Sequence, residues 1–115
     1  MSDYLKVSVK KYRFLLAQVL ALDPVVTILE NTLGPVVLTR VSNGYYRATL
    51  AGAFPKGKVA HIAEADAYTN PGELLTSGRE SDDVMCLKNI FVDGGTPQDI
   101  DNLLAEAYVE FRVYP

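Results

Sequence analysis

The chain has 115 residues, of which 49% are hydrophobic and 22% charged, and its formal net charge is −3. A chain of this length buries about 65% of the surface that its unfolded form exposes, so we expect residues 1–115 to form a single domain with its own core. The negative charge disfavours a general nucleic-acid-binding protein, because such proteins need a concentrated basic surface. We therefore expect no nucleic-acid partner.

Neither secretion nor membrane insertion is indicated by the N-terminal region. Residues 2–13 are polar and charged where a secretory signal would have its apolar core. The longest apolar run, Phe14 to Leu22, is too short to cross a bilayer. We expect a soluble protein that is made in the cytoplasm and has no membrane partner.

The N-terminal third of the chain predicts strands. Apolar and polar residues alternate from Leu5 to Lys10, which is typical of a strand with one buried face. The segment Tyr12 to Leu20 is ambiguous: good helix formers favour a helix, whereas the strands around it favour a strand, and we prefer the strand. A turn at Asp23-Pro24 and a strand from Val25 to Glu30 follow, ending in a turn over Asn31 to Gly34.

Asn43-Gly44 is the strongest local signal for a hairpin. Asn-Gly between two apolar runs favours a two-residue type I′ turn, here joining Val36–Ser42 to Tyr45–Ala51. The register predicted from this turn places six side chains on the core face: Val37, Thr39, Val41, Tyr46, Ala48 and Leu50.

The same register places Arg40 opposite Arg47 on the outer face. Like charges that face each other across a strand pair are unfavourable, so an acidic group is expected nearby. The candidates are Glu30, Glu106 and Glu110, or an anion supplied by a ligand or partner.

The second half of the chain predicts further short strands and turns. They are a turn over Gly52–Gly57, strands over Lys58–Ala63, Leu74–Ser77 and Val84–Val92, a loop over Ala65–Glu73 and a turn over Gly78–Asp83. Thr96 followed by Pro97 and by the acidic Asp99 is typical of a helix N-terminus, so one helical turn over about 97–103 is an option.

The clearest pattern lies at the C-terminal end, from Ala105 to Pro115. Small and apolar residues alternate with polar and tyrosine residues throughout, which predicts a long antiparallel strand with one buried face. Together these elements predict an all-β fold, either an antiparallel β-sandwich or a jelly-roll-like barrel of about eight strands. The runs Phe14–Ala17, Val25–Leu29 and Val36–Leu38 are apolar on both faces, so we infer that another subunit covers some of the outer surface.

The sequence holds no set of nucleophile, base and orienting group, so we expect no enzyme. His61 lies between Ala60 and Ile62 and is interpreted as structural, and the apolar neighbours of Cys86 predict a buried, unreactive thiol. One histidine and one cysteine make a poor zinc site. Acidic residues gather over positions 64–83 without the spacing of a calcium loop, so we expect neither a metal nor a cofactor. They are Glu64, Asp66, Glu73, Glu80, Asp82 and Asp83.

Tyrosine and arginine residues on predicted outer faces are the candidate contact residues. Exposed tyrosines suit subunit contacts and sugar stacking, and cross-strand packing is the simpler explanation. The predicted contact residues are Arg40, Tyr45, Arg47, Tyr108, Arg112 and Tyr114.

Three stretches carry a resemblance to known proteins: Leu29–Gly34 (LENTLG), Gly44–Phe54 (GYYRATLAGAF) and Glu110–Pro115 (EFRVYP). The chain resembles a group of short, largely uncharacterised all-β proteins found in bacteriophage and prophage gene sets. The resemblance implies an all-β fold and a virion or assembly role, and it implies no active site.

These observations predict a non-enzymatic structural or interaction protein that self-associates. Its partners would be further copies of itself or other virion proteins, as in a decoration, fibre or tail component. The alternative is a small β-sandwich module that binds carbohydrate or another small ligand.

Overall fold

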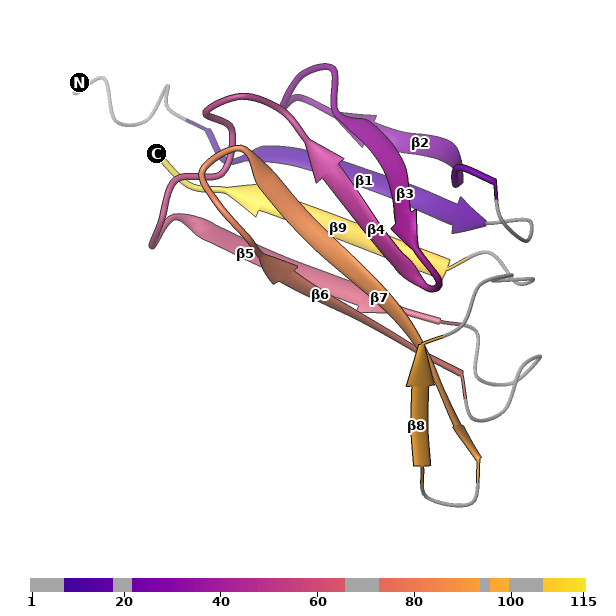
Figure 1. Ribbon diagram of the computed structural model, residues 1–115. Helices are drawn as coiled ribbons and strands as arrows, with labels where there is room; N and C mark the ends of the chain where they lie inside the picture. Colours follow the sequence, from indigo (N-terminus) through magenta and orange to yellow (C-terminus); the bar gives the residue numbers. More distant parts are fainter. Residues whose placement is uncertain (1–7, 18–21, 66–72, 94–95, 100–106) are drawn as a thin grey trace, which may run out of the picture.

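The computed structural model describes residues 8–17, 22–65, 73–93, 96–99 and 107–115, and over these residues the chain is an antiparallel β-sandwich (Figure 1). One sheet has the strand order β2-β1-β9-β5, and the other has the order β3-β4-β7-β6, with β8 paired to β7. The strands are β1 (Lys10–Ala17), β2 (Val25–Asn31), β3 (Val37–Ser42), β4 (Tyr45–Thr49), β5 (Val59–Glu64), β6 (Glu73–Arg79), β7 (Val84–Asp93), β8 (Thr96–Asp99) and β9 (Ala107–Val113).

The prediction of an all-β sandwich is confirmed, with nine strands among the described residues where about eight were expected for the chain. The first predicted strand, Leu5–Lys10, lies largely outside the described residues, and β1 begins at Lys10. β6 continues to Arg79, so the turn predicted to begin at Gly78 begins at Glu80. Over the described ranges, no helix is long and apolar enough to cross a membrane.

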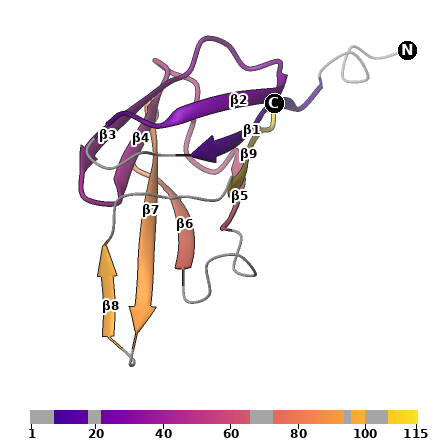
Figure 2. The ribbon, with the colours of Figure 1, turned by 90° about the vertical axis from the view of Figure 1, so that its right-hand side faces the viewer.

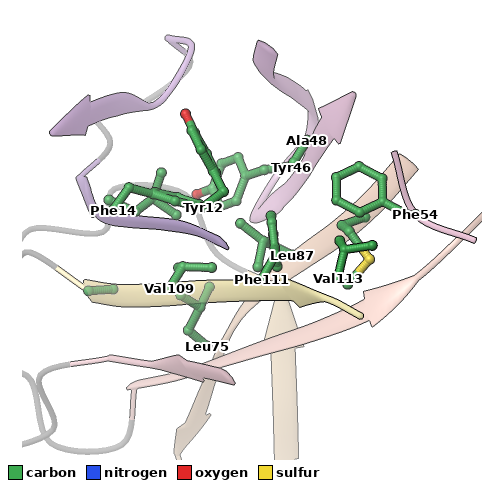
Figure 3. Packing of buried hydrophobic residues seen from close by; sticks show 13 residues of the cluster. Tyr12, Phe14, Tyr46, Ala48, Phe54, Leu75, Leu87, Val109, Phe111 and Val113 are labelled. Carbon is green, nitrogen blue, oxygen red and sulfur yellow. The ribbon is translucent and has the colours of Figure 1, made fainter. Parts of the chain in front are cut away.

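The C-terminal strand lies inside its sheet and at the centre of the core, and it has the buried face that its alternation predicted. β9 pairs with β1 on one side and β5 on the other. Val109 and Phe111 are fully buried, and the Phe111 ring centroid lies 5.8 Å from those of Phe14 and Phe54. Figure 3 shows these rings packed against Leu87 and Tyr46 of the opposite sheet. The core is therefore formed by period-two side chains from both sheets.

β1 confirms the preference for a strand over a helix. Tyr12, Phe14 and Leu16 are buried, whereas the residues between them are only half-buried. β1 pairs with β2 and with β9, so backbone hydrogen bonds on both sides outweigh the helix propensity of its leucines and alanine.

The hairpin forms where it was predicted, but its register differs by one residue. Ser42 pairs with Tyr45 across the turn, and Gly44 has the left-handed φ of 64° that such a turn needs. A β-bulge at Val41 then pairs Arg40 with Tyr46, and a one-residue shift exchanges the faces of a strand.

Two expectations for the hairpin are therefore wrong. The first concerns the core face: Val37, Thr39 and Val41 are exposed, so none of these three core-face predictions holds, whereas Tyr46 and Ala48 are buried and Leu50 packs against the core as predicted. The second concerns the arginines: Arg40 does not oppose Arg47, because Thr39 holds that position.

The helical turn predicted near 97–103 is wrong where the structure describes it. Thr96–Asp99 forms β8, which pairs antiparallel with the end of β7, and residues 100–103 lie outside the described residues. Pro97 fits this strand because an edge strand has a side that needs no N–H donor. Figures 1 and 2 show β8 and the end of β7 extending beyond the two packed sheets.

The two sides of the sandwich differ. On one side β5 and β6 lie against each other, and a hydrogen bond of 2.5 Å joins His61 Nδ1 to Ser77 Oγ. On the other side the edge strands are β2 and β3, which diverge in Figure 2. We call β2, β3 and Leu22 the open edge.

Candidate functional site

The outer face of the first sheet carries a cluster of charged and tyrosine side chains around Glu110. We call Arg13, Glu30, Tyr108, Glu110 and Arg112 the Glu110 cluster. The strand register assembles it, because Arg13 pairs with Glu110 on β9 and with Glu30 on β2. Residues that share one register row on one face have their side chains in contact distance.

Hydrogen bonds connect the members of the Glu110 cluster. Tyr108 Oη donates to Glu110 Oε1 at 2.8 Å, and Arg112 Nε donates to Glu110 Oε2. Arg13 Nε donates to Glu30 Oε1 at 2.8 Å, and Arg13 Nη1 lies 3.5 Å from Tyr108 Oη. These neighbours leave Glu110 only 4% exposed, although it lies on the outer face.

The Glu110 carboxylate stays ionised in spite of this burial. Burial opposes its ionisation, but the hydrogen bonds from Tyr108 and Arg112, together with the charges of Arg112 and Arg13, hold its pKa below the ordinary value of 4.5. The charged groups of the Glu110 cluster are therefore paired with one another. The Glu110 carboxylate is buried, and Arg13 and Arg112 are half-buried.

The outer face of the second sheet carries a smaller cluster around Tyr45, formed by Tyr45, Arg47, Glu80 and Lys88. Tyr45 Oη donates to Glu80 Oε1, and Arg47 Nε lies 3.0 Å from Glu80 Oε2. The Arg47 guanidinium and the Lys88 ammonium lie 5.4 and 5.5 Å from the centroid of the Tyr45 ring. We call this set the Tyr45 cluster.

The hydrogen bond between Tyr45 and Glu80 affects both groups. It raises the pKa of Tyr45, since an ionised phenol could not donate, and it lowers the pKa of Glu80 because it stabilises the carboxylate. We expect Tyr45→Phe to raise the pKa of Glu80 toward its ordinary value, as followed by the ¹³C shift of the Glu80 carboxyl during an NMR pH titration. Tyr108→Phe, on the opposite sheet, should leave that titration unchanged. An unaltered Glu80 pKa in Tyr45→Phe would contradict the assigned hydrogen bond.

The structure divides the predicted contact residues between two faces. Tyr45 and Arg47 lie in the Tyr45 cluster, and Tyr108 and Arg112 lie in the Glu110 cluster. Tyr114 is 42% exposed and follows β9. Arg40 belongs to neither cluster: its Nη2 donates to Asn43 Oδ1 at 2.8 Å, beside the hairpin turn.

Sequence reasoning missed several cluster members. The acid beside Arg47 is Glu80, which was assigned to a solvated acidic loop, and the expected candidates Glu30 and Glu110 pair elsewhere. The sequence offered one signal for the Glu110 cluster: Arg13 alternates with the buried residues of β1, which places it on the outer face of that strand. Because β1 pairs with β9, this is also the face of Glu110. Glu80 offered none, because its neighbours depend on how far β6 extends.

The acidic residues over positions 64–83 are divided among separate contacts where the structure describes them. Asp82 pairs with Arg79, and Asp83 Oδ1 accepts a hydrogen bond from the Gly52 amide at 2.7 Å. No group of three or more potential metal ligands occurs among the described residues. The side chains of Asp66 and Glu73 lie outside that set.

Cys86 differs from its prediction. It alternates with the buried Met85 and Leu87, so its side chain faces outward and is partly exposed, opposite Gly78 in the register. The flanking Met85 and Leu87 are core residues, but Cys86 lies on the other side of the strand.

Among the described residues, most of the exposed large hydrophobic side chains lie on the open edge. Val25, Ile28 and Leu29 of β2 and Val37 and Val41 of β3 are all exposed. Ile28 pairs with Phe14 and shares its inward face, yet it is 54% exposed, because β3 does not cover it. The side chain of Asp23 accepts a hydrogen bond from the Arg40 amide at 2.9 Å, which ties the start of β2 to the β3 edge.

Fold and surface together define an antiparallel β-sandwich with two polar outer clusters and an apolar open edge. Comparison of the chain with protein-family models, curated proteins and solved structures gave no match.

Proposed function

We propose that the chain is a non-enzymatic structural protein that self-associates through its open edge, in the role of a virion component such as a decoration, fibre or tail protein. The observation that carries this proposal is the exposure of the Ile28 side chain. An inward-facing isoleucine that remains 54% exposed is not covered by the described residues of its own chain, and covering it is favourable by the hydrophobic effect.

The backbone of the open edge supports the same conclusion. β2 pairs with β1 and β3 pairs with β4, so among the described residues each strand has one side without a neighbouring strand. β2 contains neither Lys nor Pro, the residues that commonly protect edge strands from pairing with other chains. A second copy would cover both the apolar side chains and this backbone edge.

The outer faces of the two sheets lie beside this edge, and their charged clusters could determine which partners the edge accepts. Their arginines are paired with carboxylates in the free protein, so they contribute little affinity and instead exclude partners of the wrong charge. The proposed virion role is supported by the resemblance of Leu29–Gly34 to a stretch of short all-β proteins from bacteriophage and prophage gene sets. In this protein Leu29–Gly34 forms a turn closed by Asn31, whose Oδ1 accepts from the amides of Leu33 and Gly34 at 3.0 Å, so it serves the fold.

Carbohydrate binding is the less favoured function. A sugar that stacked on Tyr45 would compete with the Arg47 and Lys88 cations that lie over its ring.

Self-association is tested by light scattering coupled to size-exclusion chromatography at micromolar concentration. The parent protein should elute as an oligomer, and Ile28→Lys combined with Val37→Lys should elute as a monomer. Both residues are more than half exposed, at 54% and 57%, so the substitutions should spare the fold, as checked by circular dichroism.

A matched control makes the same chemical change elsewhere. Ile62→Lys combined with Leu74→Lys replaces two residues that are 46% and 50% exposed on β5 and β6, and it should leave the oligomer intact. A monomeric parent protein, or equal dissociation of the control, would exclude self-association through the open edge.

A further inference from the structure

A hollow of about 520 Å³ lies at the end of the sandwich where β9 ends. This volume falls in the range of about 300–1,000 Å³ that is usual for small-molecule sites. Its apolar lining includes Leu33, Pro35, Leu50 and Val113, contributed by loops of both sheets and by β9. The hollow is separate from the open edge and from the Tyr45 cluster, and it adjoins the Glu110 cluster at Tyr114, whose side chain shares a hydrogen bond with Arg112.

Two lysines stand on either side of the end of β9 in this hollow. Lys10 and Val59 both pair with Val113, from β1 and β5 respectively, and Lys58 directly precedes Val59. The Tyr114 amide donates to the Lys58 carbonyl oxygen at 2.8 Å, which holds the end of β9 against β5. The backbone therefore places the two lysines on either side of the end of β9.

Neither lysine forms an ion pair within the described part of the protein. The arginines of the outer clusters each pair with a carboxylate, whereas no described carboxylate pairs with Lys10 or Lys58. Lys10 continues the inward alternation of Tyr12 and Phe14, so its side chain leaves the core at the hollow. An apolar surface with two unpaired cations at its rim complements a ligand that has an apolar body and a negative charge.

We propose that this hollow binds a small organic anion with an apolar body, such as an aromatic or short acyl carboxylate or sulfonate. The apolar lining would take the body, and Lys10 and Lys58 would contact the anionic group. This inference does not depend on self-association, because none of its residues belongs to the open edge.

The test uses two fluorescent probes of similar shape: anionic 1-anilinonaphthalene-8-sulfonate and neutral N-phenyl-1-naphthylamine. The parent protein should bind the anionic probe at one site per chain. Lys10→Gln combined with Lys58→Gln should weaken binding of the anionic probe about three- to tenfold, the effect of losing two partly exposed charge contacts, and should change binding of the neutral probe by about twofold or less.

The control removes two lysines from the outer faces. Lys11→Gln combined with Lys88→Gln makes the same change in net charge and should leave binding of the anionic probe unchanged. Amide shifts in ¹H–¹⁵N NMR spectra on addition of the anionic probe should centre on Leu33, Leu50 and Tyr114.

Three results would overturn the proposal: no saturable binding of the anionic probe, equal weakening by the control, or amide shifts that centre on β2 and β3. The last result would place the probe at the open edge and would leave the proposal of self-association standing.

Discussion

Replacing Phe111 by alanine should lower the free energy of unfolding by about 3–5 kcal/mol. Phe111 is fully buried at the centre of the sandwich, and its ring lies among those of Tyr12, Phe14 and Phe54. The substitution removes both the apolar area of the ring and its edge-to-face contacts, and β9 is held on both sides by strands that limit collapse into the cavity. Urea unfolding followed by circular dichroism measures the loss.

Tyr114→Ala is the matched control for this substitution. It also removes an aromatic ring from the C-terminal region, but Tyr114 is 42% exposed and lies beyond the end of β9. Its effect should be below about 1 kcal/mol, the range of surface substitutions. Equal losses for the two variants would show that the core is not organised around Phe111.

Replacing Glu110 by glutamine should lower the free energy of unfolding by about 1–3 kcal/mol at pH 7. The amide is nearly the same size as the carboxylate, but it carries no charge, and its NH₂ group turns a donor toward Arg112 or Tyr108. A buried position then holds a mismatched donor in place of a charged acceptor.

The pH dependence separates charge from shape in this variant. The pKa of Glu110 is lower in the folded protein than its ordinary value of 4.5, so the ionised carboxylate stabilises the fold fully above pH 4.5. That contribution is lost as the pH falls below 4.5 and through the depressed pKa. The difference between parent and Glu110→Gln should therefore shrink between neutral pH and acid.

Urea unfolding at neutral and acidic pH measures this difference, with Glu64→Gln as the control. Glu64 is an exposed carboxylate on β5, the strand that pairs with β9. Replacing Glu64 should change the free energy of unfolding little at either pH. A Glu110→Gln difference that stays constant down to acidic pH would mean that packing, and not ionisation, explains the role of Glu110.

The parts of the fold that were predictable are those encoded within a single strand. The alternation in Ala107–Val113 is a local property, and it identified a buried face that the structure confirms. The hairpin at Asn43-Gly44 was likewise local, since two residues determine the turn. For Lys10–Ala17, in contrast, a strand was preferred because of the strands around it, and the structure shows which of its faces is buried.

The candidate site was less predictable, because it depends on which strands are neighbours. Tyr45 and Tyr108 were both predicted to be contact residues on outer faces, but the sequence did not say how those faces are related; they lie on opposite sides of the sandwich, since their strands belong to different sheets. Glu80 was not recognised as a partner of Arg47, because Glu80 follows β6, and β6 is connected to the strand of Arg47, β4, through β7.

The sequence by itself determined the strand class, the position of the hairpin and the buried face of β9, since side-chain alternation requires no knowledge of neighbours. Only the tertiary structure decided the bulge at Val41, the strand at Thr96–Asp99, the burial of Glu110 and the exposure of Ile28. Each of these depends on contacts between residues far apart in the chain. Their free energies are comparable to the local preferences that they override.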